Sequence, residues 1–131
     1  MQKIKWWTLG YLVFVIAIIA IADQGNYAFV FNWLHSIPYG DKFGHFFLIG
    51  LLSLLINLSL GCARFELWGI NFFKGSIIVL VIITLEEFSQ VFIPSRSFDL
   101  GDLAANTLGI LCFSYLLTRL YPYQAEPTAI D

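Results

Sequence analysis

The acids and amides that follow a long apolar run are the residues of this sequence best suited to chemistry. Glu86 and Glu87 close the run from Gly75 to Leu85, and further polar groups follow at Gln90, Arg96, Asp99, Asp102 and Asn106. A charged side chain deep in a membrane helix costs roughly 2.5–3.5 kcal/mol, so it is rarely kept there without a partner or a function. This stretch is therefore where function should be sought.

Two kinds of chemistry fit these residue types. Glu86 and His45 are candidate catalytic groups, because a carboxylate or an imidazole can act as general acid or base, and the guanidinium of Arg96 suits a phosphate or carboxylate. Imidazole with carboxylates also suits several divalent metals, for which His45, Glu86 and Asp102 are the candidate ligands. The metal pattern is weak, because no paired-histidine motif is present and the second histidine, His35, lies in a loop. No cofactor is predicted, and a divalent cation remains open.

The composition indicates a membrane protein. Of the 131 residues, 59% are hydrophobic and 12% are charged, against about 25% charged in a typical soluble domain. The mean hydropathy is +0.78. A net charge of -2 with only seven Lys and Arg argues against nucleic acid as a partner. The lipid bilayer is the partner that this composition predicts.

Apolar runs predict an all-α protein, a four-transmembrane-helix bundle in a single domain over residues 1–131. The expected spans are 6–22, 43–61, 74–93 and 102–119, followed by a flexible tail at 122–131. Most of these runs approach the roughly 17–25 residues that cross a bilayer core. The first run also resembles a secretory signal with a small-residue cleavage site at 20–22, but its length favours a retained helix.

Basic residues predict the orientation. One side of the membrane would carry Lys3, Lys5, Arg64, Lys74 and Arg119, and the other only Lys42 and Arg96. Because Lys and Arg are enriched on the cytoplasmic side, both termini should lie inside the cell. The predicted localisation is that of a multi-pass protein of the cytoplasmic (inner) membrane.

This topology brings polar residues from separate regions to the outer membrane face. The predicted ligand-binding set is Asp41, Lys42, His45, Glu86, Glu87, Gln90, Arg96, Asp99, Asp102 and Asn106. At about 1.5 Å per residue, Glu86 lies about 12 Å along its helix from Pro94, beneath the interface. Glu87 is turned by about 100° from Glu86, so we expect the two not to share a partner.

Purely structural roles compete with this interpretation. Asp99 and Asp41 suit helix caps, and Lys42 suits a side chain that reaches the interface. Arg96 suits an ion pair with Glu86 or Glu87, which would join the third and fourth spans. Gln90 and Asn106 suit hydrogen bonds between helices.

Small residues at Gly101, Ala105 and Gly109 recur every four positions and predict a closely packed helix face. The expected partner is the third span, because a short loop joins it to the fourth.

The same residues carry a resemblance to a known family. Asp41-Lys42-x-x-His45-Phe46, Glu86-Glu87-x-x-Gln90, Pro94-x-Arg96 and Asp99-x-x-Asp102-x-x-x-Asn106-x-x-Gly109 resemble the VanZ-like family over residues 38–113. That family consists of small polytopic membrane proteins, and its founding type is associated with resistance to the glycopeptide teicoplanin. Phe113 stands where the family often has glycine, which puts the tight helix contact near that residue in question.

Two functions are consistent with these observations. The favoured one is an envelope-related protein with no assigned reaction, acting in the response to glycopeptides or in binding. Its outer pocket would bind a lipid headgroup, a cell-wall precursor, a peptide or a cation. The alternative is a membrane-embedded enzyme that acts on a lipid-linked or cell-wall substrate. It would use Glu86 and His45 as acid and base and Arg96 as an anion clamp. The oligomeric state is left open.

Overall fold

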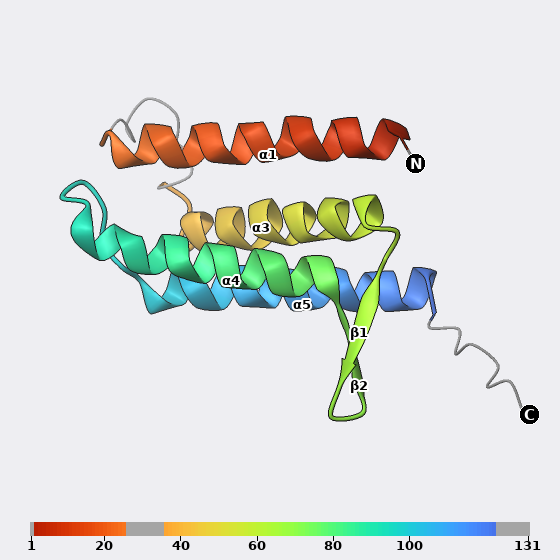
Figure 1. The fold of residues 1–131 in the computed structure, drawn as a ribbon. Coiled ribbons are helices and arrows are strands. Elements are labelled where there is room, and N and C mark those ends of the chain that lie inside the picture. The colour runs from red at the N-terminus through yellow and green to blue at the C-terminus, as the bar shows by residue number, and fades with distance from the viewer. Residues whose placement is uncertain (1, 26–35, 123–131) are drawn as a thin grey trace, which may run out of the picture.

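Four long helices dominate the computed structural model, which describes residues 2–25 and 36–122 (Figure 1). In chain order the elements are α1 (Gln2–Asp23), α3 (Gly40–Ser59), β1 (Arg64–Leu67), β2 (Ile70–Phe73), α4 (Lys74–Ser89), the 3-10 turn η1 (Gln90–Phe92) and α5 (Leu100–Leu120). Taking α4 together with η1, all four helices are long and apolar enough to cross a membrane.

The predicted helices are confirmed, with ends that differ by a few residues. α1, α3 and α5 begin at Gln2, Gly40 and Leu100, which is two to four residues before the predicted starts. The predicted starts were late because a hydropathy pattern excludes polar and charged residues at the end of a span, although the backbone of these residues is helical. η1 ends at Phe92, two residues before Pro94, as expected from the steric effect of proline on the residue before it. The flexible tail predicted at 122–131 lies outside the described residues, except for Pro122.

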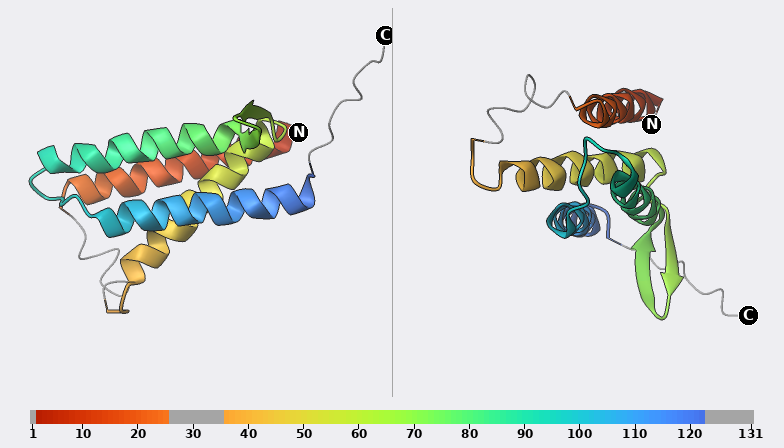
Figure 2. Two further views of the ribbon diagram at one scale, coloured as in Figure 1. Left: turned by 90° about the horizontal axis from the view of Figure 1, so that it is seen from below. Right: turned by 90° about the vertical axis from the view of Figure 1, so that its left-hand side faces the viewer.

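Successive helices run in opposite directions, so the start of α1 and the end of α5 lie at the same end of the bundle (Figure 1). The start of α3 and the loop between η1 and α5 lie at the opposite end. α3 is the central helix, because it packs against α1, α4 and α5. α1 lies on one side of α3, and α5 lies on the other (Figure 2).

Glycines set the close contact between α3 and α5. A Cβ on Gly109 would overlap the backbone carbonyl of Phe46 in α3, and one on Gly101 would meet the side chain of Lys42. The small-residue face of α5 therefore packs on α3, and the prediction that it packs on the third span was wrong. A short loop fixes which helix ends are near each other, but not which face turns inward. Phe113 does not prevent this contact, because its ring lies over Gly50 of α3, where a Cβ would overlap it.

The interior combines an apolar core with a polar network. Buried apolar side chains from all four helices form the core: Val15, Ile49, Leu52, Val79, Ile83 and Ile110. Toward the end that carries the termini, the hydroxyl of Ser76 contacts Ser53 (3.1 Å), Asn57 (2.7 Å) and Ser114 (2.7 Å). These contacts join α3, α4 and α5 through hydrogen bonds, as polar residues commonly do between membrane helices.

A β-hairpin between α3 and α4 was not predicted from the sequence, which had suggested only a connection over 62–73. Its strands pair Leu67 with Ile70, leaving Trp68 and Gly69 as a two-residue turn with φ of 52° and 75°. Positive φ at both positions matches the type I′ turn that suits a twisted hairpin. The hairpin runs across the direction of the helices (Figures 1 and 2). Strands of four residues are too short to show an alternating pattern beside long apolar runs.

Candidate functional site

A cavity of about 780 Å³ lies at the end of the bundle opposite the start of α1 and the end of α5. α1, α3 and α4 supply apolar walls, namely Val15, Ile18, Ile19, Ala22, Leu48, Ile49 and Ile83. The same lining includes seven titratable or amide side chains: Asp41, His45, Glu86, Gln90, Arg96, Asp99 and Asp102. Seven of the ten predicted binding residues therefore line one space, and Lys42, Glu87 and Asn106 contact members of that set from behind.

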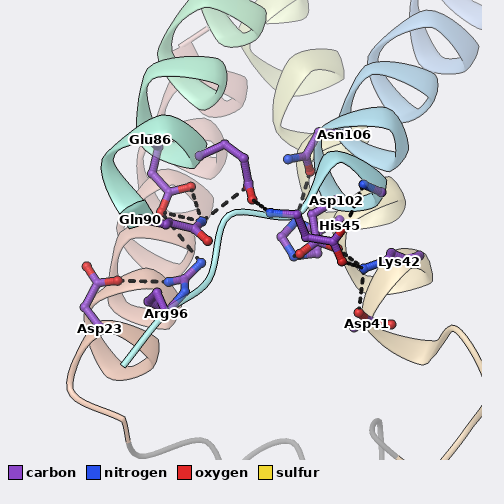
Figure 3. Close-up of polar contacts among 12 residues, drawn as sticks. Asp23, Asp41, Lys42, His45, Glu86, Gln90, Arg96, Asp102 and Asn106 are labelled. Carbon is purple, nitrogen blue, oxygen red and sulfur yellow. Dashed lines mark hydrogen bonds and ion pairs between the residues drawn. The ribbon is translucent and has the colours of Figure 1, made fainter. Parts of the chain in front are cut away.

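Arg96 connects the loop after η1 to the end of α1 (Figure 3). Its Nη1 donates to Asp23 Oδ1 at 2.9 Å, and its Nη2 lies 3.8 Å from Glu86 Oε1. The hydroxyl of the neighbouring Ser95 also donates to the carbonyl of Asp23 at 2.5 Å. Sequence reasoning anticipated the contact with Glu86 but missed Asp23. The signal was present, since Asp23 ends the first span at the same membrane level as the other polar groups.

Glu86 and Glu87 share Gln90 as a partner. Gln90 Nε2 donates to both carboxylate oxygens of Glu86, at 3.1 and 3.2 Å, and lies 3.3 Å from Glu87 Oε2. The expectation that the two glutamates could not share a partner was wrong, because the Gln90 amide follows both by one helical turn and reaches between them. The amide also stays within its own helical segment, so the expected interhelical role of Gln90 was wrong.

Glu87 is the more buried of the two glutamates. Its exposed fraction is 0%, whereas the side chain of Glu86 is 18% exposed and lines the cavity. Glu87 Oε1 lies 3.4 Å from the backbone nitrogen of Asp99, which connects α4 to the start of α5. Glu86 is thus the glutamate that a ligand in the cavity can reach. Glu87 has a structural role, because it accepts from Gln90 and from the backbone of Asp99.

Lys42 lies among three aspartates. Its Nζ is 2.9 Å from Asp41, 2.5 Å from Asp99 and 2.5 Å from Asp102. Asp99 also caps α5 by accepting from the backbone nitrogen of Gly101 at 2.7 Å, which confirms its predicted capping role. Both the Lys42 ammonium and this backbone hydrogen bond hold the pKa of Asp99 below its usual range.

The expectation that Asp41 caps α3 was wrong. The residue that precedes α3 is Tyr39, which makes no side-chain cap, and Asp41 lies in the first turn instead. The ammonium of Lys42 is held by carboxylates from α3 and from the start of α5, and its reach to the membrane interface stays a prediction.

The carboxylates around Lys42 bear on the metal hypothesis. Within the described ranges, Asp41, Asp99 and Asp102 are the group whose ligand atoms lie close enough to hold an ion, within 4.8 Å of one another. The Lys42 ammonium contacts all three, so it already supplies the positive charge at that position. The expected set of His45, Glu86 and Asp102 does not form such a group in this part of the chain.

His45 is oriented by two residues of α5 (Figure 3). Its Nδ1 lies 3.2 Å from Asn106 Oδ1, and its Nε2 lies 3.5 Å from Asp102 Oδ2. Asn106 is fully buried, so its amide fixes the imidazole from the interior and acts between helices as predicted. The two oxygens beside its ring nitrogens favour one orientation of the imidazole, in which His45 lines the cavity.

The polar residues form two groups of contacts, each of which includes residues that line the cavity. Asp23, Glu86, Gln90 and Arg96 belong to one, and Asp41, Lys42, His45, Asp99, Asp102 and Asn106 to the other (Figure 3). Glu86 and His45 both face the cavity, but no described hydrogen bond or ion pair joins them. No protein-family model, curated protein or solved structure matches this chain.

Proposed function

We propose that this chain is a VanZ-like, multi-pass protein of the cytoplasmic membrane whose cavity binds the headgroup of an envelope amphiphile. The ligand class is a lipid or a lipid-linked cell-wall precursor, and a role in the response to glycopeptides belongs to the same proposal. The observation that carries it is the cavity, which joins apolar helix walls to a charged end within one space.

The walls suit the two parts of an amphiphile. Ile19 of α1 and Ile83 of α4 line the apolar part, and His45, Glu86 and Asp102 line the polar part. Ligand sites are typically concave, with apolar linings and a few placed polar groups, at volumes of roughly 300–1,000 Å³. An acyl or prenyl chain along the helices would bring its headgroup to the charged end.

The distribution of basic residues supports an orientation with both termini inside. Lys3, Lys5, Arg64, Lys74 and Arg119 belong to the end of the bundle that carries the termini. The two basic residues of the opposite end, Lys42 and Arg96, are both paired with carboxylates. The cavity then faces the outer side of the membrane, where envelope precursors are used.

The VanZ-like resemblance is supported by the way its residues group in space. Motif residues that are far apart in sequence contact one another, as Lys42 does with Asp99 and Asp102, and His45 with Asn106. The motif therefore describes one three-dimensional arrangement and not separate helix ends.

Native mass spectrometry of the protein released from its membrane tests the binding function. We expect a retained amphiphile that is lost in Ile19→Trp, because the larger side chain fills the apolar part of the cavity. Ile16→Trp is the matched control, since Ile16 lies on α1 but is 56% exposed on the outer surface of the bundle. Equal retention in both variants, or no retained molecule in the wild type, would contradict the proposal.

A second candidate is the membrane-embedded enzyme, favoured by the fact that His45 and Glu86 both line one cavity. A substrate between them would have a proton donor and acceptor on either side. Glu86→Gln separates the two functions, because it keeps the hydrogen-bonding shape but removes proton transfer. If the protein is an enzyme that uses Glu86, cells that carry this variant should lose the envelope phenotype of the wild type. Full retention of that phenotype excludes Glu86 as acid or base.

A further inference from the structure

The charge around the cavity narrows the class of headgroup. We propose that the headgroup is cationic, an ammonium carried on an apolar chain; this rests on the proposed function, in which the cavity binds an amphiphile. Four carboxylates line the cavity, from Asp41, Glu86, Asp99 and Asp102, and Arg96 is the one Lys or Arg among the described lining residues.

Arg96 is poorly placed to act as an anion clamp. Its guanidinium donates to Asp23 at 2.9 Å and lies 3.8 Å from Glu86, and its side chain is only 11% exposed. A phosphate at this position would lie beside the negative charge of both carboxylates. The arrangement therefore disfavours the anionic headgroup that the sequence had suggested for Arg96.

Lys42, the second basic residue at this end of the bundle, does not neutralise the excess of carboxylates around the cavity. Lys42 offsets one of the three carboxylates that contact it, and Asp41, Asp99 and Asp102 still line the cavity. Protonation of His45 would add one positive charge without removing the excess. The side chains of Glu86 and Asp102 are only 18% and 15% exposed, so a cation beside them interacts with them more strongly than it would in water.

Lys42 shows that these carboxylates can bind an ammonium. Its Nζ donates to Asp41 at 2.9 Å, within the range of charge-assisted hydrogen bonds, and also contacts Asp99 and Asp102. A second ammonium, brought by a ligand, would meet the same chemistry in the cavity that Asp102 and Glu86 both line.

A metal ion fits the cavity less well than an organic cation. Divalent ions need several oxygen ligands at about 2.0–2.6 Å, and the described aspartate group that could provide them already surrounds Lys42. A metal would also make no use of the apolar wall formed by Ile19, Leu48 and Ile83. An alkylammonium uses both parts of the cavity.

Three amphiphiles of one chain length test the inference on the purified wild-type protein in a neutral detergent. Dodecylamine, dodecyl phosphate and dodecanol are each titrated, and the unfolding temperature is followed, because a ligand that binds the folded state raises it. We expect dodecylamine to stabilise the protein at concentrations at least about tenfold lower than the other two. Stabilisation by dodecyl phosphate alone overturns the cationic inference and leaves the proposed function standing. Stabilisation by none of the three overturns both.

Variants locate the binding on the charged wall. Glu86→Gln and Asp102→Asn should each weaken the apparent affinity for dodecylamine by about tenfold, since each removes a lining carboxylate. Glu66→Gln is the matched control, because Glu66 is an exposed acid on the hairpin at the other end of the bundle. Equal affinities in all three variants would overturn the assignment, and the comparison of the three amphiphiles stands even if a variant fails to fold.

Discussion

Arg96 Nη1, in the loop after η1, lies 2.9 Å from Asp23 Oδ1 at the end of α1. This ion pair joins segments 73 residues apart and ties the first helix to the wall that carries Glu86. α1 lines the cavity through its own apolar side chains, and the ion pair assigns Arg96, which had suggested anion binding, a contact that positions this helix.

Double-mutant cycles measure this relationship. Asp23→Asn combined with Arg96→Gln should show a coupling energy of about 0.5–1 kcal/mol in the free energy of unfolding, as expected for a partly exposed pair. Glu86→Gln combined with Arg96→Gln should show less, because that pair is 3.8 Å apart. A larger coupling with Glu86 than with Asp23 would be inconsistent with the geometry of the loop.

The contact between α3 and α5 makes Gly109 sensitive to a single methyl group. Gly109→Ala should lower the free energy of unfolding by about 1–3 kcal/mol, since the new Cβ would overlap the Phe46 carbonyl. Gly10→Ala is the control, because a Cβ there meets no atom within 4 Å. That variant should be neutral or more stable by about 0.5–1 kcal/mol. Unfolding in mixed micelles compares the two, and similar values for both would refute close packing at Gly109.

The depressed pKa of Asp99 predicts an acid-linked loss of stability. Because the pKa of the folded state lies below that of the unfolded state, the contribution is complete above the ordinary Asp pKa of about 3.9 and is lost as the pH falls through the folded value. Asp99→Asn should therefore lose less stability than the wild type between neutral pH and pH 3. Glu66→Gln should follow the wild type. A parallel decline for Asp99→Asn would show that the Lys42 contact does not act on this carboxylate.

The proposed orientation predicts which loops are accessible from outside the cell. In a background with Cys62 and Cys112 replaced by alanine, Ser97→Cys in the loop after η1 should react with a membrane-impermeant maleimide on intact cells. Glu66→Cys on the hairpin should react only after the membrane is opened. The reverse pattern would place the cavity on the cytoplasmic side.

The fold could be predicted from the sequence to the extent that hydropathy determines it. Apolar run lengths located the four helices, and Pro94 located the end of the third. The helix that packs on Gly109 was not predictable, because the face of α5 that turns inward depends on the shapes of all neighbouring helices. The hairpin was missed since its strands are four residues long.

The candidate site was predicted as a set of residues, but not as a set of contacts. Alternating helix directions were enough to bring Lys42, His45, Glu86 and Asp102 to one end of the bundle. Their partners depend on distances of an ångström or two, so the three aspartates around Lys42 and the pair of Arg96 with Asp23 emerged only in three dimensions.

Photo-crosslinking from inside the cavity tests the central claim most directly. A diazirine amino acid is placed at Ile83, which lines the cavity and is 6% exposed, and at its neighbour Ile82, which is 60% exposed on the outer surface. After irradiation in native membranes, the masses of the adducts are compared. We predict that position 83 captures one amphiphile strongly enriched over the bulk lipid captured at position 82. The same lipid mixture at both positions, or no lipid adduct at position 83, would contradict a ligand-binding cavity.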